Sequence, residues 1–382
     1  MNIDKLREEI NAIDEEMVDV FKRRMSVAAE IANYKKVANM PVYDSGRERE
    51  VLTKAANLAG EEFDNYARIL YSTLFNVSRS YQHEKIGENG NSPLAAEIKT
   101  AVESTEKLFP ERAVAACQGT EGAYSQSACE KLISAPSIMF TSTFEGVFSA
   151  VNSGLCRYGI LPLENSTAGS VNRVYDLMAK HRTYIVKSIR LRVNHALMAK
   201  KGVKLDDITE VISHEQALNQ CSEFLKNHPK IKVISCENTA AAAKFVAASG
   251  RSDIAAIAGG ECADTYSLSV MPKNPQNSDN NYTRFICISK KLEIYPGADR
   301  TSLVVTLPHK PGALYHIISK FYVLGMNLVK LESRPIPGSD FEFMFYFDID
   351  ASVYSPKLAR LICELESESD GFRYLGSYSE TL

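Results

Sequence analysis

The chain has 382 residues, of which 45% are hydrophobic and 24% are charged, the composition of an ordinary globular protein. This length exceeds what one compact core usually takes, so two or three domains are expected. A formal net charge of −3 gives no general attraction to nucleic acid or to anionic membranes, which excludes partners bound through bulk charge. Local clusters of basic residues are therefore more informative.

The N-terminus and the cysteines favour a reduced, cytoplasmic protein. Residues 1–7 contain no apolar core of a signal peptide, and no apolar run is long enough to span a bilayer. The cysteines are scattered without a C-x-x-C pair, and several lie in apolar runs, so disulfides and zinc are poorly supported. We expect neither a metal nor a cofactor. The eight cysteines are Cys117, Cys129, Cys156, Cys221, Cys236, Cys262, Cys287 and Cys363.

The first 85 residues are predicted to be helical. Apolar residues recur every three or four positions from 3 to 37 without Gly or Pro, which predicts one helix of about 50 Å. Asn39-Met40-Pro41 ends this helix, and shorter helices are predicted at 45–58 and 62–85. Because such short partners cannot cover the long helix, we expect it to dimerise along its length.

Basic residues on the long helix have spacings that favour binding of a small anion. Arg24 and Lys35 are eleven residues apart (35 − 24), within about 20° of one face and roughly 16 Å along the axis. Arg7 precedes Arg24 by seventeen residues (24 − 7), or roughly 25 Å, so only an antiparallel partner helix could bring an Arg7 to Arg24. Taken singly, each residue is more simply a solvated surface charge.

The next two predicted helices carry polar residues at helical spacing. Asp44 and Glu48 are four residues apart with Arg47 between them, and Ser78 and Gln82 are also four apart. Each pair therefore shares one face of its helix.

Residues 86–111 are predicted to be a linker that contains a short helix near 94–108. Gly87 to Pro93 is its most linker-like stretch. From residue 113 strands alternate with helices, which predicts mainly parallel sheets. Segments near 184–199 and the strand after Thr283 are expected to cross between two α/β lobes. The predicted strands are 113–117, 137–140, 158–161, 208–213, 231–235, 253–258 and 285–289, and the predicted helices are 143–151, 171–181, 216–227 and 239–249.

Two polar motifs lie beside predicted strands of this region. Pro162-Leu163-Glu164-Asn165-Ser166-Thr167-Ala168-Gly169 follows one strand, and Asn281-Tyr282-Thr283-Arg284-Phe285 leads into another. Polar groups at strand ends of α/β proteins face the crevice where ligands bind. The motifs offer no strong acid–base pair, and they suit a reaction that needs an immobilised anion and one weak acid. Alone, they would be a capped turn and an edge strand.

A glycine-containing segment, Gly119-Thr120-Glu121-Gly122-Ala123-Tyr124-Ser125, follows the first strand and precedes a helix. Such a segment lets backbone N–H groups approach a carboxylate. It is not G-x-G-x-x-G, so a nicotinamide-dependent enzyme is disfavoured.

Residues 300–382 are predicted to form a third unit with βαββαβ order, a small α+β sandwich with an antiparallel sheet. Pro311-Gly312-Ala313-Leu314 begins a helix whose free N–H groups can bind an amino acid carboxylate. The predicted strands are 302–306, 328–333, 342–350 and 373–378, and the predicted helices are 313–324 and 355–367.

Together these segments resemble the bifunctional chorismate mutase–prephenate dehydratases, over nearly the whole chain and in that family's order. The two polar motifs resemble the dehydratase catalytic domain, and Ser213-His214-Glu215-Gln216 with Asn219-Gln220-Cys221 resembles a third dehydratase motif. Gly312-Ala313-Leu314 and Glu332-Ser333-Arg334-Pro335 resemble a regulatory ACT domain. The first eighty or so residues resemble an all-helical chorismate mutase.

The resemblance implies a multidomain fold. It consists of an all-α mutase domain (1–85), the linker (86–111), a two-lobed periplasmic-binding-protein-like α/β dehydratase domain (112–292) and an α+β ACT domain (300–382). It also implies a cytoplasmic enzyme of phenylalanine biosynthesis that rearranges chorismate to prephenate. Prephenate then becomes phenylpyruvate with loss of carbon dioxide and water, under inhibition by L-phenylalanine. A homo-oligomer, either a dimer or a dimer of dimers, is expected, with no nucleic acid or membrane partner.

The resemblance also implies residue roles in the mutase, whose pericyclic reaction needs positioning and fixed electrostatics rather than a base. Two kinds of group would hold chorismate. Arginines would clamp the carboxylates, since guanidinium groups suit bidentate anion recognition, and polar groups would bind the oxygens. The clamp would be Arg7, Arg24 and Arg47; the donors to the ether oxygen would be Lys35 and Gln82; the groups that hold the hydroxyl would be Asp44, Glu48 and Ser78.

In the dehydratase, the implied hydrogen-bond donor to the departing hydroxyl is Thr283. Asn165, Ser166, Ser213 and Gln220 would orient the prephenate dianion. Arg284 would support the charge, or else shape the site without touching substrate. The implied phenylalanine site, at a dimer interface, consists of Gly312, Ala313, Leu314, Glu332, Ser333 and Arg334.

Two alternatives remain open from the residues. One is a dehydratase whose helical domain only dimerises, against which the intact set of mutase residues argues. The other is a non-catalytic amino acid sensor, against which Thr283 with Asn165 and Ser166 argues.

Overall fold

The computed structural model describes residues 2–86, 92–336, 342–369 and 371–382. Contacts divide the chain into two compact units. One consists of Met1–Thr100 with Asp299–Tyr374, and the other of Ala101–Ala298 with Leu375–Leu382. Residues 87–91 of the predicted linker lie outside the described residues, and α4 (Pro93–Ser104) follows them.

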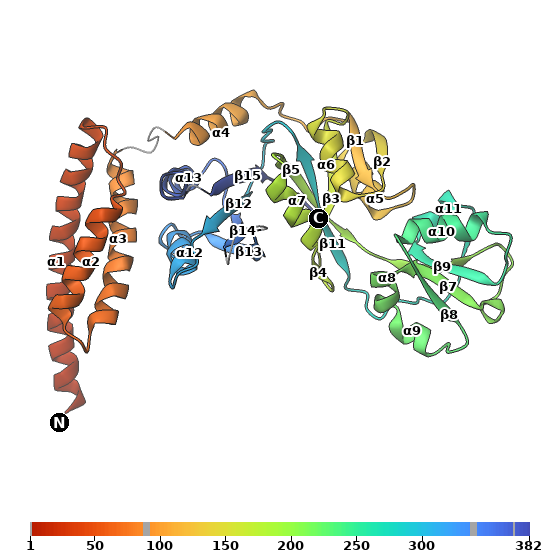
Figure 1. Ribbon diagram of the computed structural model, residues 1–382, viewed down its shortest axis with the longest axis horizontal. Coiled ribbons are helices and arrows are strands. Elements are labelled where there is room, and N and C mark those ends of the chain that lie inside the picture. The colour runs from red at the N-terminus through yellow and green to blue at the C-terminus, as the bar shows by residue number, and fades with distance from the viewer. Residues whose placement is uncertain (1, 87–91, 337–341, 370) are drawn as a thin grey trace. The chain divides into compact units, whose positions relative to one another are not determined.

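The N-terminal helices are those predicted: α1 (Ile3–Val37), α2 (Ser45–Ala59) and α3 (Asp64–Ile86) (Figure 1). Asp44 caps α2, because its carboxylate accepts a hydrogen bond from the Arg47 N–H at 2.9 Å. The buried residues of α1 are Ala28 and Ala32, so most of its length has no covering partner in the described chain. Its exposed large hydrophobic side chains are Ile3, Leu6, Ile10, Ile13, Met17, Val18, Val20, Phe21, Val27, Ile31, Tyr34 and Val37.

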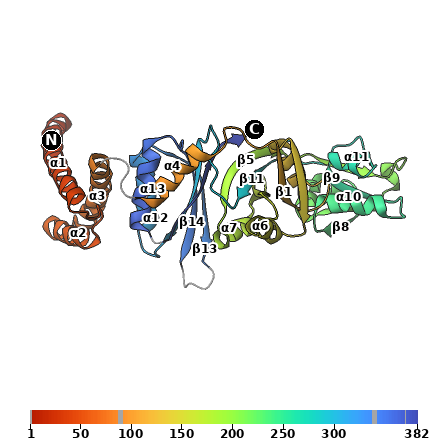
Figure 2. The ribbon, with the colours of Figure 1, turned by 90° about the horizontal axis from the view of Figure 1, so that it is seen from above.

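The other part of this unit has the predicted βαββαβ order. The sheet order is β13-β14-β12-β15, and β14 pairs antiparallel with both β12 and β13. Both helices cover one face of this sheet (Figure 2), and they also contact α3, where Asn76 Nδ2 donates to Ser319 Oγ at 2.6 Å. The elements are β12 (Arg300–Leu307), α12 (Ala313–Val323), β13 (Asn327–Pro335), β14 (Phe343–Asp350), α13 (Pro356–Glu368) and β15 (Phe372–Tyr378).

The second unit contains two α/β lobes. The sheet of the first has the order β16-β5-β11-β3-β1-β2, with β4 on β3. Its parallel pairs, β1 with β2 and β1 with β3, confirm the alternating pattern. The elements are β1 (Arg112–Gln118), α5 (Tyr124–Leu132), β2 (Ala135–Thr141), α6 (Phe144–Asn152), β3 (Tyr158–Asn165), β4 (Gly169–Ser170), α7 (Asn172–Lys180), β5 (Tyr184–Arg192), β11 (Tyr282–Ser289) and β16 (Glu380–Thr381).

The sheet of the second lobe has the order β10-β6-β9-β7-β8. The chain enters this lobe between β5 and β6 and returns between β10 and β11, so the predicted crossing is confirmed. The elements are β6 (His195–Ala199), the 3₁₀ turn Leu205–Asp207, β7 (Glu210–His214), α8 (Glu215–Gln220), α9 (Ser222–Lys226), β8 (Lys232–Cys236), α10 (Thr239–Ala248), β9 (Ile254–Gly259), α11 (Glu261–Thr265) and β10 (Ser269–Val270).

The helix predicted at 216–227 is wrong, because α8 and α9 meet at Cys221, whose φ of −117° and ψ of 17° are not helical. The Asn277 side chain stabilises the break. It accepts from the Glu223 N–H at 3.1 Å and donates to the Asn219 carbonyl at 3.3 Å. These contacts satisfy groups that a helix end leaves unpaired.

The end of the chain pairs with a strand of the second unit. Leu375–Leu382 group by contacts with Ala101–Ala298, because β16 pairs in parallel with β5. The Glu380 carboxylate also lies 2.9 Å from Nε of Arg190. The short strand β16 thereby joins a sheet of the second unit, directly after β15 of the four-stranded sheet.

Among the described helices, none has the length and apolarity needed to cross a membrane. All eight cysteines are free thiols.

Candidate active sites

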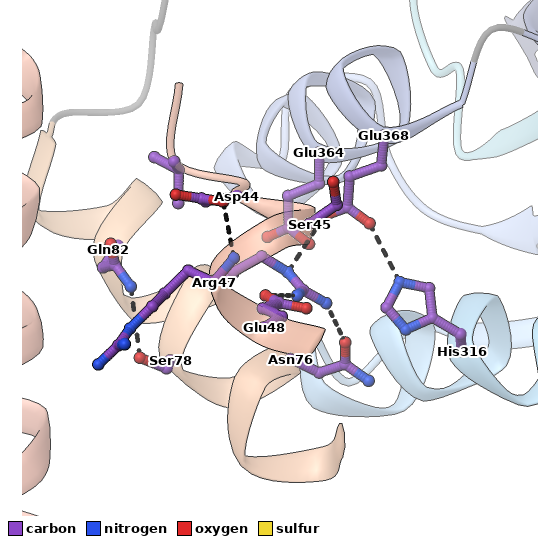
Figure 3. Close-up of polar contacts among 12 residues, drawn as sticks. Asp44, Ser45, Arg47, Glu48, Asn76, Ser78, Gln82, His316, Glu364 and Glu368 are labelled. Carbon is purple, nitrogen blue, oxygen red and sulfur yellow. Dashed lines mark hydrogen bonds and ion pairs between the residues drawn. The ribbon is translucent and has the colours of Figure 1, made fainter. Parts of the chain in front are cut away.

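The mutase residues lie on the three N-terminal helices. Arg24 and Lys35 are on α1, Asp44, Arg47 and Glu48 are at the start of α2, and Ser78 and Gln82 are on α3. Figure 3 shows the α2 and α3 members of this set. Ser78 and Gln82 are buried, and Gln82 Nε2 donates to Ser78 Oγ at 3.3 Å. The i, i+4 pair predicted on α3 is therefore a contact.

Two polar atoms of this set are buried without a hydrogen-bond partner in the described chain, Nη1 of Arg24 and Oε1 of Gln82. The guanidinium of Arg24 lies 5.9 Å from the centre of the Phe75 ring. Burial lowers the pKa of Arg24, and the nearby Tyr71 acts in the opposite direction. A buried donor without a partner is costly, so a ligand carboxylate would stabilise this guanidinium.

The remaining basic residues have local partners. Lys35 Nζ donates to the Val42 carbonyl at 2.7 Å, and Arg47 pairs with Glu50 at 2.7 Å. Arg7 is exposed and lies 3.5 Å from Asp4. Because α1 is continuous, Arg7 is about 25 Å from Arg24 along the axis, and one chain does not bring these two together.

In the dehydratase unit, Asn165 and Thr283 are brought together by strand pairing. The two residues are opposite one another where β3 and β11 pair antiparallel, and Asn165 Nδ2 donates to Thr283 Oγ1 at 2.9 Å. The same Nδ2 donates to Asn281 Oδ1 at 2.7 Å. Oδ1 of Asn165 accepts from the N–H groups of Thr167 and Ala168, at 3.1 and 2.9 Å. Asn165 is thus the centre of a polar network.

Gln220 extends this network into the second lobe. Its Nε2 donates to Thr167 Oγ1 at 2.7 Å, and its Oε1 accepts from Asn281 Nδ2 at 3.0 Å. Nε2 of His195 also lies 2.9 Å from Gln220 Oε1. Burial lowers the pKa of His195, while the Gln220 hydrogen bond acts in the opposite direction. A neutral His195 that donates from Nε2 has an unprotonated Nδ1, which lies 3.4 Å from the Tyr124 hydroxyl.

A cavity of about 370 Å³ lies between the two lobes. Its charged or ionisable lining groups are Glu237, Tyr124, His195 and His214, and none of the described lysines and arginines lines it. Two helices begin at the lining, α5 at Tyr124 and α10 at Thr239, so backbone N–H groups are available to an anion. The full lining is Gln118, Gly119, Ala123, Tyr124, Ser125, Phe144, Pro162, Asn165, Val171, Val193, His195, His214, Gln216, Ala217, Gln220, Glu237, Asn238, Thr239, Thr283 and Phe285.

Three predicted dehydratase residues lie outside this lining. Ser213 is fully buried and donates to the Ile257 carbonyl at 2.5 Å, so the expectation that it orients substrate lacks support. Ser166 Oγ accepts from the Tyr282 N–H at 2.9 Å, which joins two strands. Arg284 alternates with the lining residues Thr283 and Phe285 along β11 and pairs with Glu164 at 2.9 Å. This position fits the reading of Arg284 as a residue that shapes the site.

The predicted regulatory residues lie on two elements. Gly312 precedes α12 with a φ of +83°, a conformation that favours glycine. Ala313 and Leu314 form the first turn of α12. Glu332, Ser333 and Arg334 lie on β13, which is an edge strand of its sheet.

Sequence reasoning missed three residues that contact this network, His195, Tyr124 and Thr167. His195 could have been noticed in the sequence as the histidine that lies between two apolar strand segments, where the chain crosses from one lobe to the other. Tyr124 and Thr167 belonged to segments already selected, without a role of their own. The partner of Thr167, Gln220, is 53 residues away in the chain.

Comparisons with known proteins agree with this architecture. Residues 115–293 match the family described as Prephenate dehydratase, and residues 6–83 match the family described as Chorismate mutase type II. A bifunctional chorismate mutase/prephenate dehydratase of Aquifex aeolicus (strain VF5) is 30% identical over 380 residues, covering 99% of this chain and 98% of its own. Arogenate dehydratase/prephenate dehydratase 1, chloroplastic, of Arabidopsis thaliana is 38% identical, covering 68% of this chain and 70% of its own.

A solved structure is also similar, that of the prephenate dehydratase of Arthrobacter aurescens in complex with L-Phe. It has a TM-score of 0.64 and 28% identity, and the match covers 70% of this chain and 89% of that one.

The two-lobed cleft and the similarity over residues 115–293 define an enzyme of the prephenate dehydratase class. With the matching mutase region, the chain belongs to the bifunctional chorismate mutase/prephenate dehydratases. It carries both activities and acts in phenylalanine biosynthesis. The predicted family, fold class and activities are confirmed, and the roles of individual residues stay predictions.

Proposed function

We propose that Thr283 donates a hydrogen bond to the departing hydroxyl of prephenate. The hydrogen bond from Asn165 Nδ2 to Thr283 Oγ1, at 2.9 Å, carries this proposal. Because Oγ1 accepts from the amide, its own hydrogen can point to the substrate. The ring carboxylate leaves as carbon dioxide, its bonding electrons enter the ring, and the hydroxyl, protonated with a proton from solvent, leaves as water. A threonine is too weak an acid to give up a free proton, so it stabilises the leaving group electrostatically.

The prephenate dianion is held by neutral groups. Among the residues that the structure describes, the cavity lining contains the starts of α5 and α10 but neither lysine nor arginine, which supports binding of carboxylates by backbone N–H groups. Gln220, oriented by His195 and Asn281, holds the substrate from the second lobe. Asn165 positions Thr283, and Arg284 acts through its pair with Glu164.

In the mutase, Arg24 and Arg47 bind the carboxylates of chorismate, and Lys35 and Gln82 donate to its ether oxygen. The unpartnered Nη1 of Arg24 supports this assignment. Gln82 currently donates to Ser78, so its amide must turn over to present Nε2 to the ligand. Asp44, Glu48 and Ser78 hold the hydroxyl group.

The enzyme is a homodimer, or a dimer of dimers, in which α1 packs antiparallel on its partner. The exposed apolar face of α1 supports this, since contiguous apolar surface of that extent marks an interaction site. The partner supplies Arg7 to the pocket that contains Arg24.

L-Phenylalanine inhibits the enzyme by binding to Gly312, Ala313 and Leu314 and to Glu332, Ser333 and Arg334, shared between two subunits. The Arthrobacter aurescens complex with L-Phe supports this ligand, and the positive φ of Gly312 leaves the start of α12 open to a carboxylate. The free thiols support a reducing, cytoplasmic location.

A coupled assay tests the proposal, with chorismate supplied and phenylpyruvate measured. Full conversion without added prephenate requires both sites. Arogenate is supplied in parallel, because a relative carries that name. Turnover of arogenate but not of prephenate would contradict the substrate assignment.

A further inference from the structure

Arg79 is a buried arginine on α3, next to Ser78 and outside the predicted mutase set. Its side chain is only 3% exposed. Nη2 donates to Asn76 Oδ1, and the guanidinium lies 5.4 Å from the centre of the Tyr43 ring. It is about 100° around α3 from Ser78, and its guanidinium contacts Glu48 of α2 and Glu368 of α13. A buried arginine requires paired carboxylates, since an uncompensated buried charge is strongly destabilising.

The first carboxylate is that of Glu48 on α2, which is assigned to the hydroxyl of chorismate. Nη1 of Arg79 donates to Glu48 Oε1 and forms an ion pair with it. The Glu48 side chain is 23% exposed, so it reaches ligand-accessible space while Arg79 does not. Charge-assisted hydrogen bonds of arginine fix both distance and orientation. Arg79 therefore holds one oxygen of Glu48 and orients the other.

The second carboxylate is that of Glu368, the last residue of α13 in the ACT domain. Its Oε1 lies 3.2 Å from Nε of Arg79 and 2.9 Å from Nζ of Lys320, and its Oε2 lies 3.1 Å from Nε2 of His316. Figure 3 shows Glu368 and His316 on the ACT helices, opposite Glu48 and Asn76. Burial tends to raise the pKa of Glu368. The His316 hydrogen bond and the charges of Lys320 and Arg79 outweigh it and lower the pKa to about 2.

We propose that Arg79 is a positioning residue of the mutase site and that Glu368 anchors it. Helices α12 and α13 of the ACT domain then complete the support of a site whose ligand-binding groups belong to the N-terminal helices. This inference rests on the proposed role of Glu48. It makes Arg79 act through Glu48 and not on the reacting atoms.

The test uses the full chain with Arg79→Met. The mutase KM should rise at least tenfold with a smaller change in kcat, because Glu48 binds the hydroxyl in both substrate and transition state. Dehydratase turnover of supplied prephenate should stay within twofold of the wild-type value. This measurement shows that the variant chain is folded. Arg79→Lys should restore part of the affinity, and Glu368→Gln should raise KM less than Arg79→Met. If Arg79→Met does not fold, Glu368→Gln decides by the same measurements.

Arg360→Met is the matched control. Arg360, on α13, is another arginine at the contact between α13 and α3. It lies 3.4 Å from Ser80 Oγ and 3.4 Å from Glu84 Oε2, without reaching Glu48. Its loss should leave the mutase KM unchanged. An equal rise of KM in Arg360→Met would overturn the proposal, because general loosening of the contact would then explain the effect.

A double-mutant cycle with Glu48→Gln separates this inference from the proposed function. If Arg79 acts through Glu48, Arg79→Met adds little to the effect of Glu48→Gln. Full additivity overturns the inference. If Arg79→Met has a normal mutase KM while Glu48→Gln is impaired, the inference about Arg79 is overturned and the assigned mutase site stands. If Glu48→Gln also has a normal mutase KM, the assigned site is overturned as well.

Discussion

Asn165 and Thr283 lie opposite one another on β3 and β11, and the amide of the first donates to the hydroxyl of the second at 2.9 Å. This leaves the Thr283 hydrogen for the substrate. Thr283→Ala should lower dehydratase turnover about a hundredfold or more, with a smaller change in prephenate binding, because the backbone donors remain. Thr283→Ser should keep most of the activity. Near-normal turnover of Thr283→Ala in a stopped assay of phenylpyruvate would move the donor role to another group.

Lys35 should be needed for the mutase alone. The charge that it stabilises develops only as the ether bond of chorismate breaks, so Lys35→Ala should abolish mutase turnover while the dehydratase still acts on supplied prephenate. Lys36→Ala is the control, since Lys36 is the neighbouring residue on α1 and donates to the Ile86 carbonyl at 2.6 Å. It should keep mutase activity. Loss of both activities in folded Lys35→Ala would contradict the two-site arrangement.

Local patterns were sufficient for much of the fold. The limits of α1 were predicted as found, because its apolar spacing runs uninterrupted from residue 3 to 37. The break at Cys221 was not predictable, because it depends on Asn277, 56 residues later (277 − 221). The same limit applies to Arg79, whose partner Glu368 is 289 residues away (368 − 79). For Ser213 the motif predicted a residue that faces the substrate. Its hydroxyl instead donates to the Ile257 carbonyl on the neighbouring strand, a contact that the motif alone does not reveal.

Mixing of inactive subunits should restore mutase activity. Arg7→Ala and Arg24→Ala proteins should each be nearly inactive, because Arg7 is about 25 Å from Arg24 of its own helix. In a mixed dimer one pocket has both arginines, so statistical exchange should recover about a quarter of the sites. A mixture of Arg24→Ala with Lys35→Ala should recover nothing, since both residues belong to one chain's pocket. Absence of recovery despite exchange detected by mass spectrometry would mean that each pocket comes from one chain.

His83 should make the first unit less stable in mild acid. Its Nε2 is buried without a hydrogen-bond partner among the described residues. Burial, with the positive charges of Lys320, Arg79 and Arg360, lowers its pKa from 6.5 to about 4, and Glu368 acts in the opposite direction. The unfolded chain therefore binds more protons between pH 6.5 and 4. Over that range the free energy of unfolding should fall by up to about 3 kcal/mol as the pH falls.

His83→Gln should remove that part of the pH dependence. The measurement is the difference in melting temperature between pH 7.5 and pH 5, for wild type and variant in the same buffers. The comparison is needed because other buried groups titrate too; burial raises the pKa of Glu364, for example. Equal pH dependence in both proteins would exclude His83 as the source.

Gly312→Val should weaken inhibition by L-phenylalanine with little effect on uninhibited turnover. The φ of Gly312 is +83°, a conformation that a β-branched residue rarely adopts, so valine should distort the start of α12. Gly202→Val is the matched control, because Gly202 has a φ of +85° with equally open surroundings and lies in the dehydratase unit. It should keep normal inhibition. Substitution is a cleaner test than deletion of residues 300–382, which would also remove β16 from the dehydratase sheet. Calorimetry should detect weaker phenylalanine binding to Gly312→Val; unchanged binding would place the amino acid elsewhere, with the substrate cleft as the next site to examine.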